Sequence, residues 1–537
     1  MSRKKVIAGV TAVASGAALV TVISVAGTAN AATLAWQPCD NGLPMECASV
    51  SVPMDYSAPD GEQITIAISR VKATDPARRR GVLFTNPGGP GGEGRIFPLN
   101  YVDLPIAAVY DIVGIDVRGL GASTKLTCVE PNTDDLQQGT VGTSRPADAD
   151  FATIAEVARR TEAGCVAGGG TFRKHVNTPN TARDLDRVRE ALGEEKISYL
   201  GVSYGTWLGA VYGEMFPERL DRSVLDSSLD PGKTWQDQNE DTLASTKGNF
   251  DAWARWTAAR DSTFHLGDTV WEVRAAIDTI AAVAAQRPVA GFENQTAFDT
   301  GVGESTRYRL SWAPFAKNMG ATLAEVNGKR PDPALAASNK RAADAARELS
   351  AADDGGVSAA VYQTVTCDWD WSTDLNSYYR DMRWWRTFLP YGNTVNTVQP
   401  NNCAFHERDG EELPRVGRAE YAPGLVLGAE GDTQTALDNS TAMARTLGNS
   451  LIRVHNDGTH GVYGPGDDPI KANACVNDKV NAYLVDGVLP AHRVSDCETA
   501  NPPAAVPADG HGLPGSVPIP DLGELVEQIL AAVLPRR

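Results

Sequence analysis

Short apolar runs recur along much of the chain and alternate with stretches that have a helical pattern. Continuous runs of this length predict strands buried on both faces, which are typical of a mainly parallel sheet covered by helices on both sides. Two early segments alternate between apolar and polar residues and predict half-buried strands. The predicted strands are residues 48–56, 63–71, 81–85, 109–117, 197–202, 222–226, 424–429 and 450–455. The pattern as a whole predicts an α/β fold.

This alternation stops after Asp230-Pro231-Gly232 and resumes near residue 424. To about Pro400 the chain is helical in pattern and alanine-rich, and it holds nine of the eleven tryptophans. We interpret this stretch as an insertion into the α/β core, with an aromatic surface that suits a ligand. The expected organisation is a signal peptide at 1–31, core at 32–231, a helical insertion at 232–400, core again at 401–500, and a Pro/Ala-rich tail at 501–537 whose terminal helix is loosely attached.

The N-terminus predicts export. Basic residues precede an apolar stretch from Val6 to Ala26, and Ala29-Asn30-Ala31 fits a small-residue cleavage site. Polar residues interrupt the apolar stretch, which argues against a membrane anchor, and no later segment is apolar enough to span a bilayer. The formal net charge of −18 argues against nucleic acid or anionic membranes as partners. We therefore expect a secreted, extracellular protein.

Eight cysteines, an even number in an exported chain, predict four disulfides. Short sequence separation favours local pairs, although connectivity does not follow from sequence alone. None of the cysteine spacings resembles a zinc site, and we expect neither a metal nor a cofactor. The favoured pairs are Cys39–Cys47, Cys128–Cys165, Cys367–Cys403 and Cys475–Cys497.

The stretch Gly201-Val-Ser-Tyr-Gly205 fits the G-x-S-x-G nucleophile elbow. A predicted strand precedes it and a short helical segment, Thr206 to Phe216, follows it, which is the context that the motif requires. The glycines leave room for neighbouring backbone around a strained turn. This places the hydroxyl at a helix N-terminus, where negative charge is favoured. We predict that Ser203 is a nucleophile.

A serine nucleophile needs a base and a group that orients the base. His460 follows a predicted strand in a glycine-flanked loop, and Asp432 follows the preceding strand. The order Ser203, Asp432, His460 is that of α/β-hydrolases. Asp438 and Glu430 are weaker alternatives for the acid, and His455 is expected to pack within its strand.

Two further motifs complete a resemblance. These are Asn86-Pro-Gly-Gly-Pro-Gly-Gly92, whose glycines suggest backbone close to a substrate oxyanion, and Asp116-Val-Arg-Gly-Leu-Gly-Ala-Ser123. Together with the elbow, Asp432 and His460, they resemble the proline iminopeptidase-related α/β-hydrolases, and among these the secreted bacterial tripeptidyl aminopeptidases. The resemblance covers roughly residues 55–480. It implies an α/β-hydrolase fold in which the insertion forms a cap.

The resemblance also implies an activity: a serine exopeptidase that releases short peptides, with tripeptides the expected length, from free N-termini of peptides or proteins. The oxyanion donors would be the N–H groups of Gly89 and Tyr204. Carboxylates would hold the substrate ammonium, and Glu93, Asp368 and Asp370 are the candidates. Glu93 departs from the small residue usual in such loops, and the acid loop lacks the proline that often follows in relatives.

Two other functions compete with this one. An exported esterase or lipase-like hydrolase would use the same triad on an ester. A catalytically inactive binding protein would keep the fold, but the presence of Ser203, His460 and a plausible acid argues against it. The oligomeric state is left open.

Overall fold

The computed structural model describes residues 34–39, 42–136, 142–330, 358–408, 410–417, 420–465, 471–509 and 521–525, with isolated positions in 333–341 and at 519. The predicted signal peptide, residues 1–31, lies outside the described residues, as do residues 526–537 of the tail. In the part of the chain that is described, no helix is long and apolar enough to cross a membrane.

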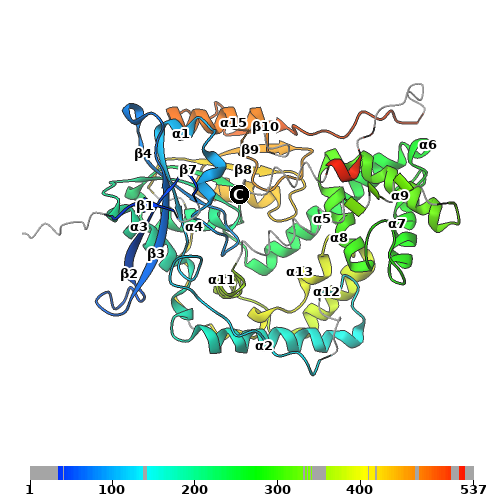
Figure 1. Cartoon of the computed structure of the whole chain (residues 1–537), viewed down its shortest axis with the longest axis horizontal. Helices are drawn as coiled ribbons and strands as arrows, with labels where there is room; N and C mark the ends of the chain where they lie inside the picture. The colour runs from blue at the N-terminus through cyan, green and yellow to red at the C-terminus, as the bar shows by residue number, and fades with distance from the viewer. Residues whose placement is uncertain are drawn as a thin grey trace, which may run out of the picture.

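A ten-stranded sheet forms the core and confirms the predicted α/β architecture (Figure 1). Its first three strands pair antiparallel, β3 pairs antiparallel with β5, and the other seven are parallel. In spatial order the strands are β1 (Gln37–Pro38), β2 (Glu46–Pro53), β3 (Gln63–Val71), β5 (Tyr110–Ile115), β4 (Gly81–Asn86), β6 (Ile197–Val202), β7 (Leu220–Asp226), β8 (Leu425–Ala429), β9 (Ser450–His455) and β10 (Val494–Glu498).

Both faces of the central strands are buried because successive side chains point to opposite sides. On β6, for example, Tyr199 belongs to one apolar cluster and Leu200 to the other. The first cluster packs against α3 (Thr178–Ala191), α4 (Tyr204–Met215) and α14 (Leu437–Leu447). The second packs against α1 (Ile106–Val109) and α15 (Ala474–Asn481). Two-sided burial explains why these strands are continuous apolar runs in the sequence.

The insertion forms a helical cap beside the sheet (Figure 1). Between 235 and 398 its described residues form helices without a strand. Phe250, Trp253, Phe298 and Phe315 lie at the centre of a separate apolar core. The helices are α5 (Trp235–Ala258), α6 (Asp261–Phe264), α7 (Val270–Ala284), α8 (Gln295–Arg307), α9 (Trp312–Val326), α11 (Ala359–Val365), α12 (Leu375–Phe388) and α13 (Thr394–Val398).

Packing does not follow the expected boundaries of the insertion. Helix α2 (Phe151–Gly169), which the sequence did not predict, precedes the insertion but packs its N-terminal turn against Met382 of α12 and Val395 of α13 (Figure 1). Helix α11 lies within the insertion, but its Val361 and Val365 belong to the core cluster of the sheet. The cap and the core therefore share elements across both boundaries.

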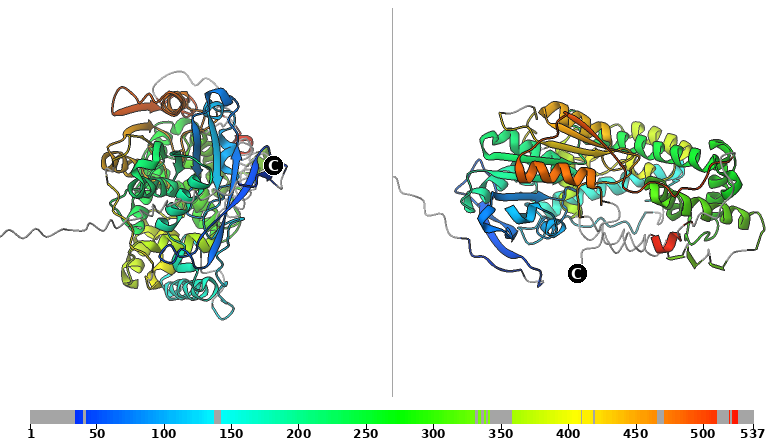
Figure 2. Two further views of the ribbon diagram at one scale, coloured as in Figure 1. Left: turned by 90° about the vertical axis from the view of Figure 1, so that its left-hand side faces the viewer. Right: turned by 90° about the horizontal axis from the view of Figure 1, so that it is seen from above.

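The four favoured disulfides are all present, so the local pairing is confirmed. Of the predicted terminal helix only residues 522–525 are described, and Leu522 there is buried; the rest of that prediction lies outside the described residues. The tail is also attached before that helix. After β10 it crosses from the sheet to the cap (Figure 2), where Val506 and Leu522 are buried in the cap core. The Arg260 side chain donates to the Val506 carbonyl at 2.7 Å, and the Ser262 N–H donates to Asp509 at 2.9 Å. The described tail residues 501–509 and 521–525 thus give the cap a further connection along the chain.

Candidate active site

Ser203 stands in a sharp turn between β6 and α4. Its backbone has φ 59° and ψ −128°, which is a strained conformation for a residue other than glycine. The neighbouring structure holds it there, because its N–H donates to the Asp226 carbonyl at 3.0 Å and α4 begins at the next residue. The half-buried hydroxyl therefore lies at the N-terminus of a helix, at the carboxyl end of the parallel strands.

The glycine-rich loop after β4 packs directly on this turn. A Cβ atom at Gly88 would lie 2.4 Å from the Val202 carbonyl oxygen and 2.9 Å from Ser203 Cβ, so only glycine permits this approach. Gly89, the next residue, is thereby brought to the start of α4. The N–H of Tyr204 belongs to the first helical turn, where it has no acceptor within the helix.

Asp432 and His460 are in direct contact. Asp432 follows β8 and is fully buried, and its Oδ2 lies 2.8 Å from His460 Nδ1. The Thr435 hydroxyl donates to the same oxygen at 2.9 Å, and the Gln434 N–H donates to Oδ1 at 2.8 Å. Because Asp432 occupies Nδ1, the neutral imidazole keeps Nε2 to accept a proton.

Two neighbours, His460 and Arg307, lower the pKa of Asp432. Burial raises the pKa of this carboxyl, but His460 and the Arg307 guanidinium, 3.7 Å from Oδ1, lower it by more. The net pKa is below the usual range of an aspartate. Asp432 is therefore an anion at neutral pH, as a partner for an imidazolium must be.

Asp226, at the end of β7, joins the two halves of the site. Its carbonyl accepts from Ser203, and its carboxylate accepts from the N–H groups of Val462 and Tyr463 at 3.0 and 2.9 Å. Among the described residues no hydrogen bond joins Ser203 Oγ to His460. The serine turn and the histidine loop are instead both hydrogen-bonded to Asp226. No role was predicted for Asp226 from the sequence, although an acid at the end of an apolar strand is a signal that could have identified it.

The alternatives to Asp432 lie elsewhere. Asp438 is exposed in the first turn of α14. Glu430 is exposed too, and it lies 3.5 Å from Nδ1 of His455, whose Nε2 is 2.9 Å from Asp496. Of the three acids considered, only Asp432 contacts His460.

Asp368 is connected to the residue that follows the nucleophile. Its Oδ2 accepts from the Thr178 N–H at 3.1 Å and from the Thr178 hydroxyl at 3.4 Å. The same hydroxyl is 2.8 Å from the Tyr204 hydroxyl. Burial raises the pKa of Asp368 to about 7, and the Thr178 hydrogen bonds and Arg408 act against that rise only in part.

Aromatic rings surround this part of the site. The Trp369 ring centroid lies 5.5 Å from that of Trp207 and 5.2 Å from that of Trp235, and Trp235 lies 6.4 Å from Tyr204. Such faces attract cations and exclude water. The half-buried carboxyl of Asp368 beside them is a suitable partner for an ammonium group.

The other two candidate carboxylates have different surroundings. Glu93 is exposed and lines a polar cavity of about 460 Å³ with Arg95, Asp116 and Lys125, whose lining does not include Ser203 or His460. The Asp370 side chain is 85% exposed and lies 3.1 Å from Arg408. Neither is linked through Thr178 to Tyr204 as Asp368 is.

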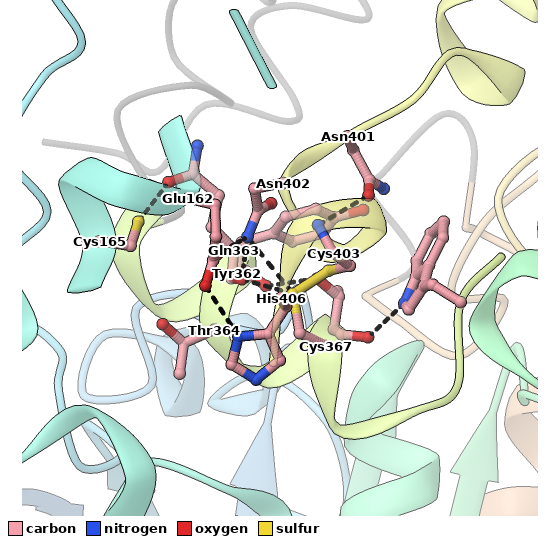
Figure 3. Close-up of a disulfide and its surroundings, with 12 residues drawn as sticks. Glu162, Cys165, Tyr362, Gln363, Thr364, Cys367, Asn401, Asn402, Cys403 and His406 are labelled. Carbon is pink, nitrogen blue, oxygen red and sulfur yellow. Dashed lines mark hydrogen bonds and ion pairs between the residues drawn. A yellow bond between two sulfur atoms is a disulfide. The ribbon is translucent and has the colours of Figure 1, made fainter. Parts of the chain in front are cut away.

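A disulfide and a buried ion pair fix the segment that carries Asp368 (Figure 3). Cys367, the preceding residue, is bonded to Cys403. Nearby, Glu162 Oε1 lies 2.8 Å from His406 Nδ1, and Arg173 pairs with the same carboxylate at 2.6 Å. Burial raises the pKa of Glu162, but these partners lower it by more, so the net pKa is about 2. Asp368 is thus held on a rigid support.

Comparisons with known proteins show the family of this chain and several relatives. A model of the alpha/beta hydrolase fold family matches residues 82–466. A tripeptidyl aminopeptidase of Streptomyces lividans is 34% identical over 505 residues, covering 89% of each chain. Serine protease Hip1 of Mycobacterium tuberculosis is 29% identical over 484 residues, 85% of this chain and 89% of the relative. Carboxylesterase B of the same organism is 29% identical over 479 residues, 83% of this chain and 85% of the relative.

Proposed function

Because this chain belongs to the α/β-hydrolase fold family and is a serine hydrolase related to tripeptidyl aminopeptidases, we propose that it removes short peptides from free N-termini. Tripeptides are the proposed products. Ser203, His460 and Asp432 are the proposed triad, and peptides or proteins with a free α-amine are the proposed substrates.

The chemistry follows from the positions of these groups. Ser203 Oγ attacks the carbonyl carbon of the third residue while His460 Nε2 takes the hydroxyl proton. Asp432 stabilises the imidazolium, and the N–H groups of Gly89 and Tyr204 bind the oxyanion. The imidazolium then gives its proton to the departing amine, which leaves a peptidyl ester on Ser203. Water, deprotonated by His460, hydrolyses that ester and releases the peptide.

The observation that supports an exopeptidase most strongly is Asp368. Its half-buried carboxyl has a pKa of about 7 and lies beside aromatic rings. Thr178 contacts both this carboxyl and the Tyr204 hydroxyl. An α-amine has an unperturbed pKa of roughly 7.7–8.0, so most of it is cationic near neutral pH. It would supply the positive partner for the Asp368 carboxylate. We therefore place the substrate's N-terminus at Asp368.

The test compares a tripeptide p-nitroanilide with its N-acetylated form. Acetylation removes the cation and leaves a buried carboxylate unpaired, so kcat/KM should fall by about a hundredfold or more. Asp368→Asn should lose activity on the free amine but be indifferent to acetylation. Asp370→Asn is the matched control, because this neighbouring acid is exposed and should behave as wild type. Equal turnover of free and acetylated substrate by the wild-type enzyme would contradict the aminopeptidase assignment.

Export is part of the proposal. Four disulfides and the leader-like N-terminus support it. N-terminal sequencing of protein recovered from the culture medium should begin at Ala32, and recovery of the intact chain only from cells would contradict it.

An esterase remains the second candidate, because carboxylesterase B is among the relatives and the triad serves either reaction. Turnover of a short acyl p-nitrophenyl ester, set against that of the tripeptide anilide, separates the two. An esterase would prefer the acyl ester and ignore the α-amine.

A further inference from the structure

The cap contacts the loops that carry the acid and the base. Arg307, the last residue of α8, has a side chain that is only 4% exposed. Its Nη2 lies 3.7 Å from Asp432 Oδ1, and its Nε donates to the Gly458 carbonyl at 2.6 Å. Gly458 is two residues before His460. One cap side chain thus reaches both loops at once.

The approach of the base loop to Arg307 requires glycine. A Cβ atom at Gly458 would lie 2.3 Å from the Arg307 carbonyl oxygen and 2.9 Å from its Cγ. A second cap contact is present on the acid loop, where the Asn249 side-chain amide of α5 donates to the Gly431 carbonyl at 2.7 Å. The two loops are therefore built to lie against the cap.

The hydrogen bonding of Arg307 points to a role beyond holding the cap. Its Nη2 is buried and, within the part of the chain that the structure describes, has no hydrogen-bond partner. A buried donor left in this way is costly, so the position has a reason other than local stability. The nearest anion is Asp432 Oδ1, the oxygen on the side of the carboxylate away from His460.

We propose that Arg307 is a positioning residue for the triad, through which the cap holds Asp432 and the loop of His460 in their working arrangement. The guanidinium attracts Oδ1 and so keeps Oδ2 turned toward the imidazole. The Asp432 carboxylate lies between the Arg307 guanidinium and His460, so Arg307 repels the protonated form of His460 only weakly. The Nε–H bond to Gly458 fixes the backbone that leads to the base. This inference rests on the proposed triad.

The experiment measures the chemistry of Ser203 apart from peptide recognition. The second-order rate constant for labelling by a fluorophosphonate reports the nucleophile and its base, and kcat and KM for the tripeptide anilide are measured beside it. The variants are Arg307→Gln, which removes the charge, and Arg307→Lys, which keeps the charge but lacks the planar guanidinium that reaches both loops. The matched control is Arg145→Gln, because Arg145 pairs with buried Asp299 of α8 at 2.8 Å. Its ion pairs within the described residues are with Asp299 and Asp278, and not with either loop.

We expect Arg307→Gln to lower both the labelling rate and kcat by about tenfold to a hundredfold, with little change in KM. Arg307→Lys should recover part of the loss, which a purely structural role would not predict. Arg145→Gln should label at nearly the wild-type rate even if its unfolding temperature falls. Wild-type labelling of Arg307→Gln, or equal losses in it and Arg145→Gln, would overturn the inference.

Two further outcomes also decide the question. If Arg307→Gln does not fold, Arg307→Lys alone is compared with wild type, and an unchanged labelling rate overturns the inference. If the wild-type enzyme is not labelled at Ser203, the proposed triad fails, and the positioning role fails with it. That result is recognised before any variant is made.

Discussion

The nucleophile and the acid–base pair are supported in different ways. Ser203 is held by the α/β core, between β6 and α4, and its N–H donates to the carbonyl of the last residue of β7. Asp432 and His460 lie on loops that have the sheet on one side and cap helices α5 and α8 on the other. The same triad therefore has one member fixed by the core and two members fixed between the core and the cap.

This difference suggests a division of labour. A strained turn needs a rigid support, and a parallel sheet buried on both faces supplies it. The acid and base must instead be aligned with a substrate that the cap helps to bind. Changes in the core should abolish the chemistry, whereas changes in the cap should alter its rate and its choice of substrate.

The largest expected effect lies on the core side. Ser203→Ala removes the nucleophile and should lower kcat by on the order of a millionfold, because no other group can form the acyl-enzyme. Thermal unfolding should be unchanged, since the sheet and α4 remain intact. Turnover of the tripeptide anilide and the melting temperature are the two measurements. Substantial residual turnover would show that Ser203 is not the nucleophile.

An intermediate effect is expected at Asp226, which serves both sides. In Asp226→Asn the amide keeps one oxygen and turns an NH₂ toward a backbone N–H, so one contact to Val462 or Tyr463 is lost. An unpaired buried donor costs about 1–3 kcal/mol of unfolding free energy. We expect kcat to fall about tenfold or more with KM less affected. Asp221→Asn, an exposed change on the same strand, is the control, and equal kinetics in the two variants would contradict a joining role.

The smallest expected effect is on the cap side, and it is a dependence on pH of substrate recognition by Asp368. Burial raises the pKa of Asp368 to about 7, so its carboxylate forms as pH rises through that value. The ratio of wild-type kcat/KM to that of Asp368→Asn cancels the titration of the triad. For a free-amine substrate this ratio should rise about fivefold from about pH 6 to about pH 7.5, then decline as the α-amine loses its proton. A ratio independent of pH would place amine recognition elsewhere.

Much of the core could be predicted from the sequence because each central strand is apolar on both faces. β9 was predicted at the bounds observed, and β6 was predicted as the short apolar run that begins at Ile197 and leads into the elbow. Edge strand β10 was missed, since Val494–Glu498 is polar and mostly exposed, and its position depends on pairing with β9. Helix α2 was missed too, because its buried face includes small or polar residues such as Ala155, Ala158 and Glu162.

The residues that support the acid and base could not be found in this way. Asn249 is 182 positions from Gly431, and Arg307 is 151 positions from Gly458. No local pattern marks such pairs, because their partners are set by how the cap sits on the sheet. Sequence order and loop context suggested Asp432 and His460, whereas the arrangement around them required the folded chain.

The segment that crosses from β10 to the cap has a consequence for the order in which the enzyme is completed. Val506 and Leu522 fill the cap core, yet they follow every strand of the sheet and every helix of the cap along the chain. Chains are synthesised from the N-terminus, and parts made early can begin to fold before later parts emerge. The cap core cannot be completed before these residues have been made, and helices α5 and α8, which contact the loops of the acid and the base, pack on that core. A hydrolase assembled in this sequence remains unfinished while its own chain is still being made.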